Sequence, residues 1–319
     1  MRPKWVTAKA GFSAALISAV LMSAAAVAAP AGAASAAAAP STPGAAPAAS
    51  NTQVALLDCG GLPCVTVRLT SGPPVKLLFD SGNAVSMLGL RQAKALGLPL
   101  TPYRNRAGQL VPGVLLAQVS GARLGSVMLP PLRIAVLDLG QGGVPKCDGL
   151  LSYVTFKDRV VSIDYAHHML EVSNPGAQVA APGAAGRLTY PTFGRKGPPI
   201  VATTGFEVNG RPITVQVDTL YSGTLLIYPT SVAKLGLQTE AAATERRHFP
   251  FTDGGVDMIE GRALAESFGG KGLLSNAPLY FATPQVHVPD GMFDGTVGAE
   301  LLTGHTVTFD FHANRFWIV

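Results

Sequence analysis

The sequence predicts an all-β protein built from two lobes that are related by a pseudo-twofold axis and that carry a few short helices. Three observations lead to this prediction. The chain has 36 Gly and 25 Pro among 319 residues, which favours many short strands and turns over long helices. Most apolar segments alternate apolar and polar residues, as in "PCVTVRL", "VVSIDY" and "TVTFDF". The third observation is an internal repeat along most of the chain.

The first fifty residues differ from the rest in composition. Three basic residues precede an apolar stretch, and Ala-Val-Ala at 26–28 suits a signal peptidase. We therefore expect a signal peptide over 1–29 and a secreted or periplasmic protein, with an uncleaved N-terminal membrane anchor as the alternative. Residues 30–50 contain only Ala, Pro, Gly, Ser and Thr, and we expect them to form a disordered linker.

The charge of the chain and the length of its apolar segments argue against a nucleic-acid partner and against a membrane span after the leader. The net charge is +5, but three of the basic residues lie in the predicted signal peptide, and no run rich in Lys and Arg follows. Nucleic acid is therefore not expected as a partner. No later stretch is long and apolar enough for a membrane span, so none is expected in the mature chain.

The repeat is visible in two pairs of segments. "VKLLFDSGNAVSMLGLRQAKALGL" at 75–98 is similar to "ITVQVDTLYSGTLLIYPTSVAKLGL" at 213–237: each has a strand that ends in Asp, a polar turn, an apolar run and a helical pattern that ends in Leu-Gly-Leu. Likewise, "DGLLSYVTFKDRVVSIDY" from 148 matches "DGTVGAELLTGHTVTFDF" from 294, with the same 16-residue spacing between the first and last Asp. We therefore expect lobe 1 over 51–175, a linker over 176–189 and lobe 2 over 190–319.

The chain has three cysteines. Cys59 and Cys64, in "DCGGLPCVTV", are close enough in sequence to close a small loop through a disulfide in an oxidising compartment. Cys147 is then left over as a small buried hydrophobic residue, and its pairing with one of the other two is the open alternative. No His or second Cys lies at ligand spacing near any of them, so no metal site is expected.

Two turns and the block behind them connect the chain to a known family. "FDSG" ends the strand with Asp80, "VDTLYSG" does the same with Asp218, and "DGLLSY" and "DGTVGAE" form the repeated block downstream. With these motifs the chain resembles the aspartic peptidases, in which each lobe supplies one Asp at a strand-ending Asp-Thr/Ser-Gly turn. It is more similar to bacterial proteins built from two retropepsin-like units than to the longer pepsins. The resemblance spans nearly the whole chain after the leader and implies two acid-protease-like β lobes.

The resemblance also implies the residues of a site. Asp80 and Asp218 would form the catalytic pair, because two carboxyl groups a hydrogen bond apart share one proton. Ser81 and Thr219 would place their hydroxyl groups across the lobe interface and brace the two turns. Gly82 fits a turn that leaves little room for a Cβ.

The function implied is that of an exported aspartic-type endopeptidase, which hydrolyses peptide bonds with a water activated between the two carboxyl groups. The substrate would be a peptide or an unfolded protein. The mechanism needs neither a cofactor nor a metal ion. Both halves of the site lie in one chain, so we expect a monomer.

Lobe 2 departs from the family pattern. Leu220 stands where the family has Gly, while Asn83 and Tyr221 occupy positions where it prefers Ser, Thr or Ala. Asn83 can still donate to a carboxylate, and Tyr221 would either donate or obstruct. The alternative function is therefore a catalytically degenerate module that kept the cleft for binding a peptide or protein.

Four further Asp residues are expected to have structural roles. Asp148 and Asp294 open the matched turns, while Asp164 and Asp310 precede the turn of the last hairpin in each half. A flap hairpin is expected near 105–119 in lobe 1, because Gly108 and Gly113 permit a tight tip. In lobe 2, His248 lies in the region of the equivalent flap.

Overall fold

The computed structural model describes most of the chain after the first fifty residues. The described ranges are 51–105, 107–139, 147–175, 186–192, 199–249, 256–262, 266–269, 271–274, 277–282 and 292–319. The predicted signal peptide and the linker over 30–50 therefore lie outside the described residues. Within the described ranges, no helix has the length and apolar character needed to cross a membrane.

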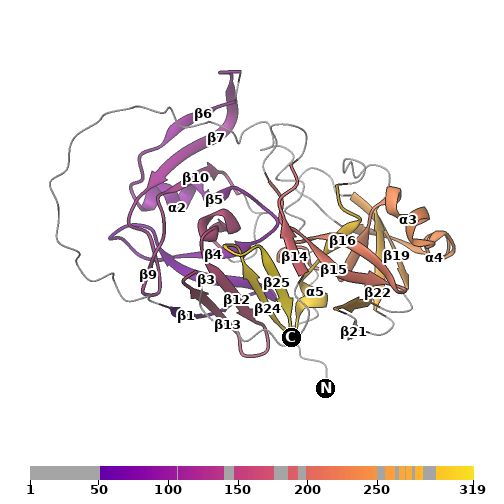
Figure 1. Ribbon diagram of the computed structural model, residues 1–319. Coiled ribbons are helices and arrows are strands. Elements are labelled where there is room, and N and C mark those ends of the chain that lie inside the picture. The colour runs from indigo at the N-terminus through magenta and orange to yellow at the C-terminus, as the bar shows by residue number, and fades with distance from the viewer. Residues whose placement is uncertain are drawn as a thin grey trace, which may run out of the picture.

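The first half of the chain consists of short strands with one helix and one 3-10 helix (Figure 1). The elements are β1 (Thr52–Ala55), β2 (Leu57–Cys59), β3 (Leu62–Arg68), β4 (Val75–Asp80), β5 (Ser86–Gly89), α2 (Leu90–Ala95), β6 (Thr101–Arg104), β7 (Leu110–Val119), β8 (Arg123–Leu124), β9 (Val127–Met128), β10 (Leu132–Leu137), β11 (Gly149–Ser152), η2 (Tyr153–Phe156), β12 (Val160–Asp164) and β13 (Met169–Ser173). We call the part around the sheet from β2 to β11 lobe 1.

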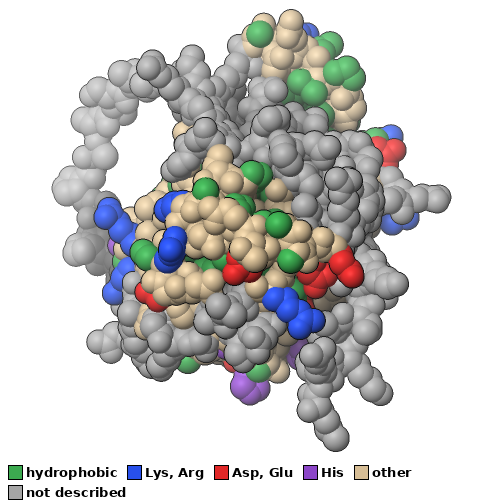
Figure 2. All heavy atoms as spheres, turned by 90° about the vertical axis from the view of Figure 1, so that its right-hand side faces the viewer, with side chains coloured by type: hydrophobic (Ala, Val, Ile, Leu, Met, Phe, Trp, Pro, Cys, Tyr) green, Lys and Arg blue, Asp and Glu red, His purple; other side chains and the backbone are tan. Residues whose placement is uncertain are grey.

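The second half has the same character, with three short helices. The elements are β14 (Gly186–Thr189), β15 (Ala202–Val208), β16 (Arg211–Val217), β17 (Leu225–Ile227), α3 (Pro229–Leu235), α4 (Gln238–Ala242), β18 (Glu245–Phe249), β19 (Val256–Arg262), β20 (Glu266–Phe268), β21 (Lys271–Leu274), β22 (Pro278–Ala282), β23 (Gly295–Val297), α5 (Ala299–Leu302), β24 (Thr306–Asp310) and β25 (Arg315–Ile318). We call the part around β15 to β23 lobe 2. On its outer side, described charged side chains of both signs are intermixed (Figure 2).

The two lobes have the same strand order and the same strand directions. In lobe 1 the order is β4-β11-β5-β10-β7-β6, with β4–β11 and β5–β10 parallel and the other pairs antiparallel. In lobe 2 the order is β16-β23-β17-β22-β19-β18, again with the first and third pairs parallel. The predicted fold class of two duplicated β lobes with a few short helices is thus confirmed.

A central sheet joins the halves between the two lobes (Figure 1). Its strands run in the order β1-β13-β12-β24-β25-β14, so that β12 of the first half pairs with β24 of the second. In this antiparallel pair Ser162 lies opposite Thr308, and their hydroxyl groups are 2.9 Å apart. These two residues occupy equivalent places in the sequence repeat, so the pseudo-twofold axis passes between them.

Residues at one edge of the predicted linker take part in this sheet. β14 (Gly186–Thr189) pairs with β25 on one side and with β15 on the other. The rest of the linker, 176–185, lies outside the described residues, so the lobe boundaries stay a prediction.

Matched Asp residues hold equivalent turns in the two halves, as the sequence predicts. Asp148 accepts a hydrogen bond at Oδ2 from the backbone N–H of Lys76 (2.8 Å), and Asp294 accepts one at Oδ2 from Thr214 N–H (2.9 Å). Lys234 also places its Nζ 2.8 Å from Asp294 Oδ1. Each Asp therefore fixes the strand that ends at Asp80 or Asp218, which is a structural role.

The last hairpins are fixed in the same way. Asp164 accepts a hydrogen bond from His167 N–H at 2.9 Å, and Asp310 accepts one from Ala313 N–H at 2.8 Å. Arg315 pairs with the other oxygen of Asp310. The expected structural role of these two acids is confirmed.

One large apolar core runs through both halves and the central sheet. Phe79 of β4 packs edge to face against Phe309 of β24, with ring centroids 6.2 Å apart, and Phe309 packs on Phe316. The strand that carries Asp80 is thus anchored on the sheet shared by both halves.

Candidate active site

Asp80 and Asp218 end equivalent strands. Asp80 is the last residue of β4 and Asp218 directly follows β16, and each strand pairs in parallel with a neighbour, β11 or β23. The side chains of both acids are fully buried. Because the last three residues before each Asp, 77–79 and 215–217, are buried, burial of the strand carries the carboxyl group at its end into the interior with it.

Ser81 and Thr219 lock the two turns together across the lobe interface. The hydroxyl group of Ser81 donates to the carbonyl oxygen of Val217, and that of Thr219 donates to the carbonyl oxygen of Phe79, both at 2.7 Å. In return, each hydroxyl oxygen accepts from the opposite backbone: Ser81 N–H to Thr219 Oγ1 and Thr219 N–H to Ser81 Oγ, both at 3.1 Å. Four buried hydrogen bonds therefore fix the two Asp-bearing turns relative to each other.

Gly82 touches both carboxyl groups. Its N–H donates to Asp80 Oδ1 at 2.9 Å. A Cβ at this position would lie 2.5 Å from Cγ of Asp218, which is closer than atoms can approach. The carboxyl group of Asp218 thus lies directly against the turn that holds Asp80, and only glycine fits between them.

The turn in lobe 2 holds Asp218 with backbone donors as well. The N–H groups of Leu220 and Tyr221 donate to Asp218 Oδ1 at 2.9 and 3.2 Å. The replacement of glycine by Leu220 therefore leaves the backbone donor of the turn in place.

Each carboxyl group has one oxygen held by these donors and one that is not. Oδ2 of Asp80 and Oδ2 of Asp218 are buried and have no hydrogen-bond partner among the described residues. Burial and the negative charge of Asp218 raise the pKa of Asp80 well above its ordinary value. Burial raises the pKa of Asp218 to about 6, against the lowering effect of the N–H groups of Leu220 and Tyr221. Because the charge of Asp218 raises the pKa of Asp80, the two acids titrate as a coupled pair.

The side chain of Leu220 is buried in an apolar cluster that consists mainly of lobe 1 residues, among them Leu78, Met87 and Leu150. Leu220 is therefore an apolar contact between the lobes. The physical reason lies in its chemistry, since a leucine side chain is stabilised by apolar contacts and not by a carboxylate.

The hydroxyl group of Tyr221 does not donate to the carboxyl groups. Its side chain is buried, its hydroxyl group has no hydrogen-bond partner among the described residues, and it packs in an apolar cluster of lobe 2 with Tyr228 and Tyr280. Gly223 and Gly298 make room for it, because a Cβ on Gly223 would lie 2.3 Å from the hydroxyl oxygen of Tyr221 and one on Gly298 would lie 2.5 Å from its Cδ1. Only its backbone takes part in the site.

Asn83 differs from expectation too. Its Oδ1 accepts from the N–H of Val85 at 3.0 Å, while its Nδ2 is buried without a partner among the described residues. The carbonyl oxygen of Asn83 accepts from Ser152 Oγ at 2.6 Å. Ser152, which replaces the last glycine of the repeated block in lobe 1, therefore supports the turn from behind.

Gln216 is a contact that the sequence reasoning missed. It is buried two residues before Asp218, and its Nε2 donates across the interface to the carbonyl oxygen of Gly82 at 3.3 Å. Thr296 donates to its Oε1 at 3.3 Å. The available signal was a polar side chain among the apolar residues of "VQVD", just before the Asp218 turn.

The flap region of lobe 1 is a hairpin of β6 and β7, which projects from the lobe (Figure 1). Asn105 closes its tip by accepting from the N–H groups of Ala107 and Gln109, and Gly108 and Gly113 have φ values of 77° and 75°. In lobe 2, β18 and β19 form the equivalent hairpin. The side chain of His248 in β18 lies outside the described residues.

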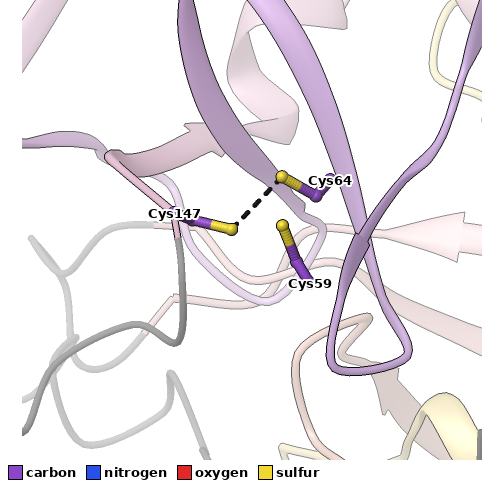
Figure 3. Close-up of side chains that lie close together, drawn as sticks. All are labelled: Cys59, Cys64 and Cys147. Atoms are coloured by element: carbon purple, nitrogen blue, oxygen red, sulfur yellow. Dashed lines mark hydrogen bonds between the residues drawn. The ribbon is translucent and has the colours of Figure 1, made fainter.

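All three cysteines carry free thiols, where the sequence led us to expect a disulfide between Cys59 and Cys64. Cys147 joins them, because its Sγ lies 3.2 Å from Cys64 Sγ (Figure 3). No metal site is expected here from the sequence, but the three Sγ atoms lie within 4.8 Å of one another, which is close enough to hold a metal ion. Hydrogen bonds from Cys147 and Cys64 lower the pKa of Cys59 to about 4.

Comparison with known proteins gives a resemblance in structure only. No family model matches the chain. No curated protein matches it in sequence. Among solved structures, it is similar to the crystal structure of Basic 7S globulin from soybean, with 12% sequence identity, coverage of 84% of this chain and 94% of that chain, and a TM-score of 0.45. The chemistry of this site therefore follows from its own geometry.

Proposed function

We propose that this chain is an exported aspartic-type endopeptidase that hydrolyses peptide bonds with a water activated between Asp80 and Asp218. The observation that carries the proposal is the pair of buried turns, braced by Ser81 and Thr219, that directs two carboxyl groups toward one place. A structural role for two fully buried acids would require partners for all their oxygens. Here one oxygen of each acid has none among the described residues.

The raised pKa values of the two acids suit a pair that shares one proton. The ionised carboxyl group of the pair acts as the general base that takes a proton from the attacking water. The protonated one donates to the carbonyl oxygen on which negative charge develops. The N–H groups of Gly82 and Leu220 hold Oδ1 of each acid, which leaves Oδ2 of each acid to act on the water and the substrate.

The substrate in this proposal is a peptide or an unfolded protein in extended conformation. Such a chain can lie between the two turns and the β6–β7 and β18–β19 hairpins, which stand at equivalent places in the two lobes. The reaction takes place outside the cytoplasm, in agreement with the leader that the sequence predicts.

The test is cleavage of an unfolded protein and a peptide library by the chain without its leader. Asp80→Asn and Asp218→Asn should each lower kcat by at least about 100-fold, because each removes one proton-transfer group. The matched control is Asp164→Asn, an acid that fixes a distant hairpin, which should leave kcat unchanged. Full activity in both dyad variants would remove the dyad from the mechanism.

A non-catalytic peptide-binding module is the second candidate. The observation in its favour is the asymmetry of the turns, since Gly82 leaves no room for a Cβ beside Asp218 whereas Leu220 has a full side chain at the equivalent place. This candidate predicts saturable peptide binding without turnover, unchanged in Asp218→Asn. Multiple turnovers that a pepstatin-like inhibitor abolishes would exclude it.

A further inference from the structure

Three cysteine side chains from separate segments of lobe 1 converge on one point. Cys59 ends β2, Cys64 lies in β3, and Cys147 precedes β11, 83 residues further along the chain than Cys64. Their Sγ atoms all lie within 4.8 Å of one another. Figure 3 shows the three thiols directed toward one another from three sides.

The hairpin register disfavours a direct bond between the two cysteines that are closest in sequence. In the β2–β3 pair, Cys59 lies opposite Leu62 and Cys64 lies opposite Leu57, so the cysteines are diagonal neighbours on one face. Cβ atoms of diagonal neighbours are usually well beyond the roughly 4 Å span of a disulfide. Two thiols in this relation are better placed to bind one atom between them than to bond to each other.

The surroundings suit a soft, weakly hydrated ion. Cys59 and Cys64 are buried in an apolar cluster with Leu78 and Leu150, whereas Cys147 is only partly buried and gives the cluster a side that solvent reaches. Sulfur ligands in such an environment select thiophilic metals over hard cations such as Mg²⁺ or Ca²⁺.

We propose that Cys59, Cys64 and Cys147 form a three-thiolate metal site that binds one Cu(I) ion. Binding displaces the thiol protons to solvent and forms three Cu–S bonds, without any change in oxidation state. Three sulfur ligands complete the coordination of Cu(I), whereas Zn²⁺ requires a fourth ligand, which would have to come from solvent. This site is separate from Asp80 and Asp218 and does not depend on the proposed peptidase activity.

The ion would join the β2–β3 hairpin to the segment that leads into β11. Because β11 runs parallel to β4, the strand that ends in Asp80, the metal would stabilise the layer behind the lobe 1 turn. A ligand that binds only the folded protein raises the free energy of unfolding in proportion to the logarithm of its concentration. We therefore expect Cu(I) to raise the Tm of the whole protein.

The experiment titrates the reduced chain, without its leader and under anaerobic conditions, with Cu(I) in competition with a bathocuproine chelator. We expect one equivalent to bind, with a thiolate-to-copper band in the ultraviolet and a higher Tm. Zn²⁺ is the second probe. Its affinity, measured in competition with a zinc chelator, should be lower than the affinity for Cu(I). Failure of the reduced protein to bind one Cu(I) would overturn the proposal, as would a disulfide among these cysteines that persists in the exported protein.

Cysteine variants test whether the three thiols themselves bind the ion. Cys147→Ser, at the partly exposed position, should fold normally by circular dichroism. It should weaken Cu(I) binding by more than about 100-fold, because the loss of a ligand costs more affinity than the loss of a residue that only hydrogen-bonds to a ligand. Cys59→Ser should do the same. Asp80→Asn should bind Cu(I) as the unmodified chain does, whether or not the protein is a peptidase. Unchanged affinity in Cys147→Ser would exclude the site.

Discussion

The buried carboxyl group of Asp218 makes the stability of the protein depend on pH in an unusual direction. Most carboxyl groups in folded proteins have a lowered pKa, and they stabilise the fold as pH rises. Burial raises the pKa of Asp218 to about 6, so its ionisation destabilises the folded state. The stability associated with its neutral form is present below the unfolded pKa and is lost as pH rises through about 6.

Asp218→Asn should therefore stabilise the protein at neutral pH, because the amide imitates the neutral acid. Urea unfolding should show a gain on the order of 1–3 kcal/mol near pH 7 that shrinks toward about pH 4. Asp294→Asn is the control with the opposite sign: burial alone would raise the pKa of Asp294, but Lys234, Thr214 and Ser231 hold it below its ordinary value. A loss of stability in Asp218→Asn that is equal at both pH values would contradict this assignment.

At Gly82, the addition of a single methyl group should disturb the geometry of the two carboxyl groups. Gly82→Ala places a Cβ 2.5 Å from Cγ of Asp218, so one of the two turns must move. A shift of about 1 Å in such a site costs on the order of 100-fold in rate, which peptide cleavage would show.

The control for Gly82→Ala is Gly125→Ala, where a Cβ would meet Thr52 in a part of lobe 1 remote from the carboxyl pair. It should lower the Tm without lowering kcat per folded molecule. Equal loss of kcat in both variants would mean that general strain, rather than the contact with Asp218, accounts for the effect.

At the scale of elements, the two turns work as one unit because each hydroxyl group bonds to the opposite strand. Thr219→Val removes the donor to Phe79 and the acceptor for Ser81 N–H. We expect a loss of about 2–4 kcal/mol in unfolding free energy, since two buried backbone groups lose their partner. We also expect kcat to fall, because the carboxyl groups lose their relative position.

Thr308→Val provides the comparison, since it removes the hydroxyl pair with Ser162 on the same pseudo-twofold axis but in the central sheet. It should lower stability and leave kcat unchanged. If Thr219→Val lost stability without losing activity, the brace would be a structural feature only.

The equivalence of the lobes is also a property of elements that short motifs made predictable. Alternation of apolar residues and the Asp-Gly turns indicated the duplicated strands, because these signals depend on residues a few positions apart. The contacts of Leu220 and Tyr221 were not predictable in this way. Their side chains point into apolar clusters that strands from other parts of the chain complete.

At the scale of the whole molecule, the central sheet makes the two halves one cooperative unit. β12 and β24 pair along five residues, and one apolar core continues through both halves. If either half unfolded, the apolar core of the other half and the edge of its central strand would be exposed to water. Calorimetry should therefore show one unfolding transition, with equal calorimetric and van't Hoff enthalpies. Two separate transitions would show that the lobes fold independently.

The sequence by itself determined the β class, the duplication and the pairing of Asp80 with Asp218 as equivalent residues. These features are encoded locally and twice, so that each copy supports the interpretation of the other. The tertiary structure alone decided that Gly82 lies against Asp218, that Leu220 packs on lobe 1, and that Cys147 meets Cys64 across 83 residues. Such contacts depend on how distant segments pack, and side-chain packing across long separations leaves no periodic signal in the chain.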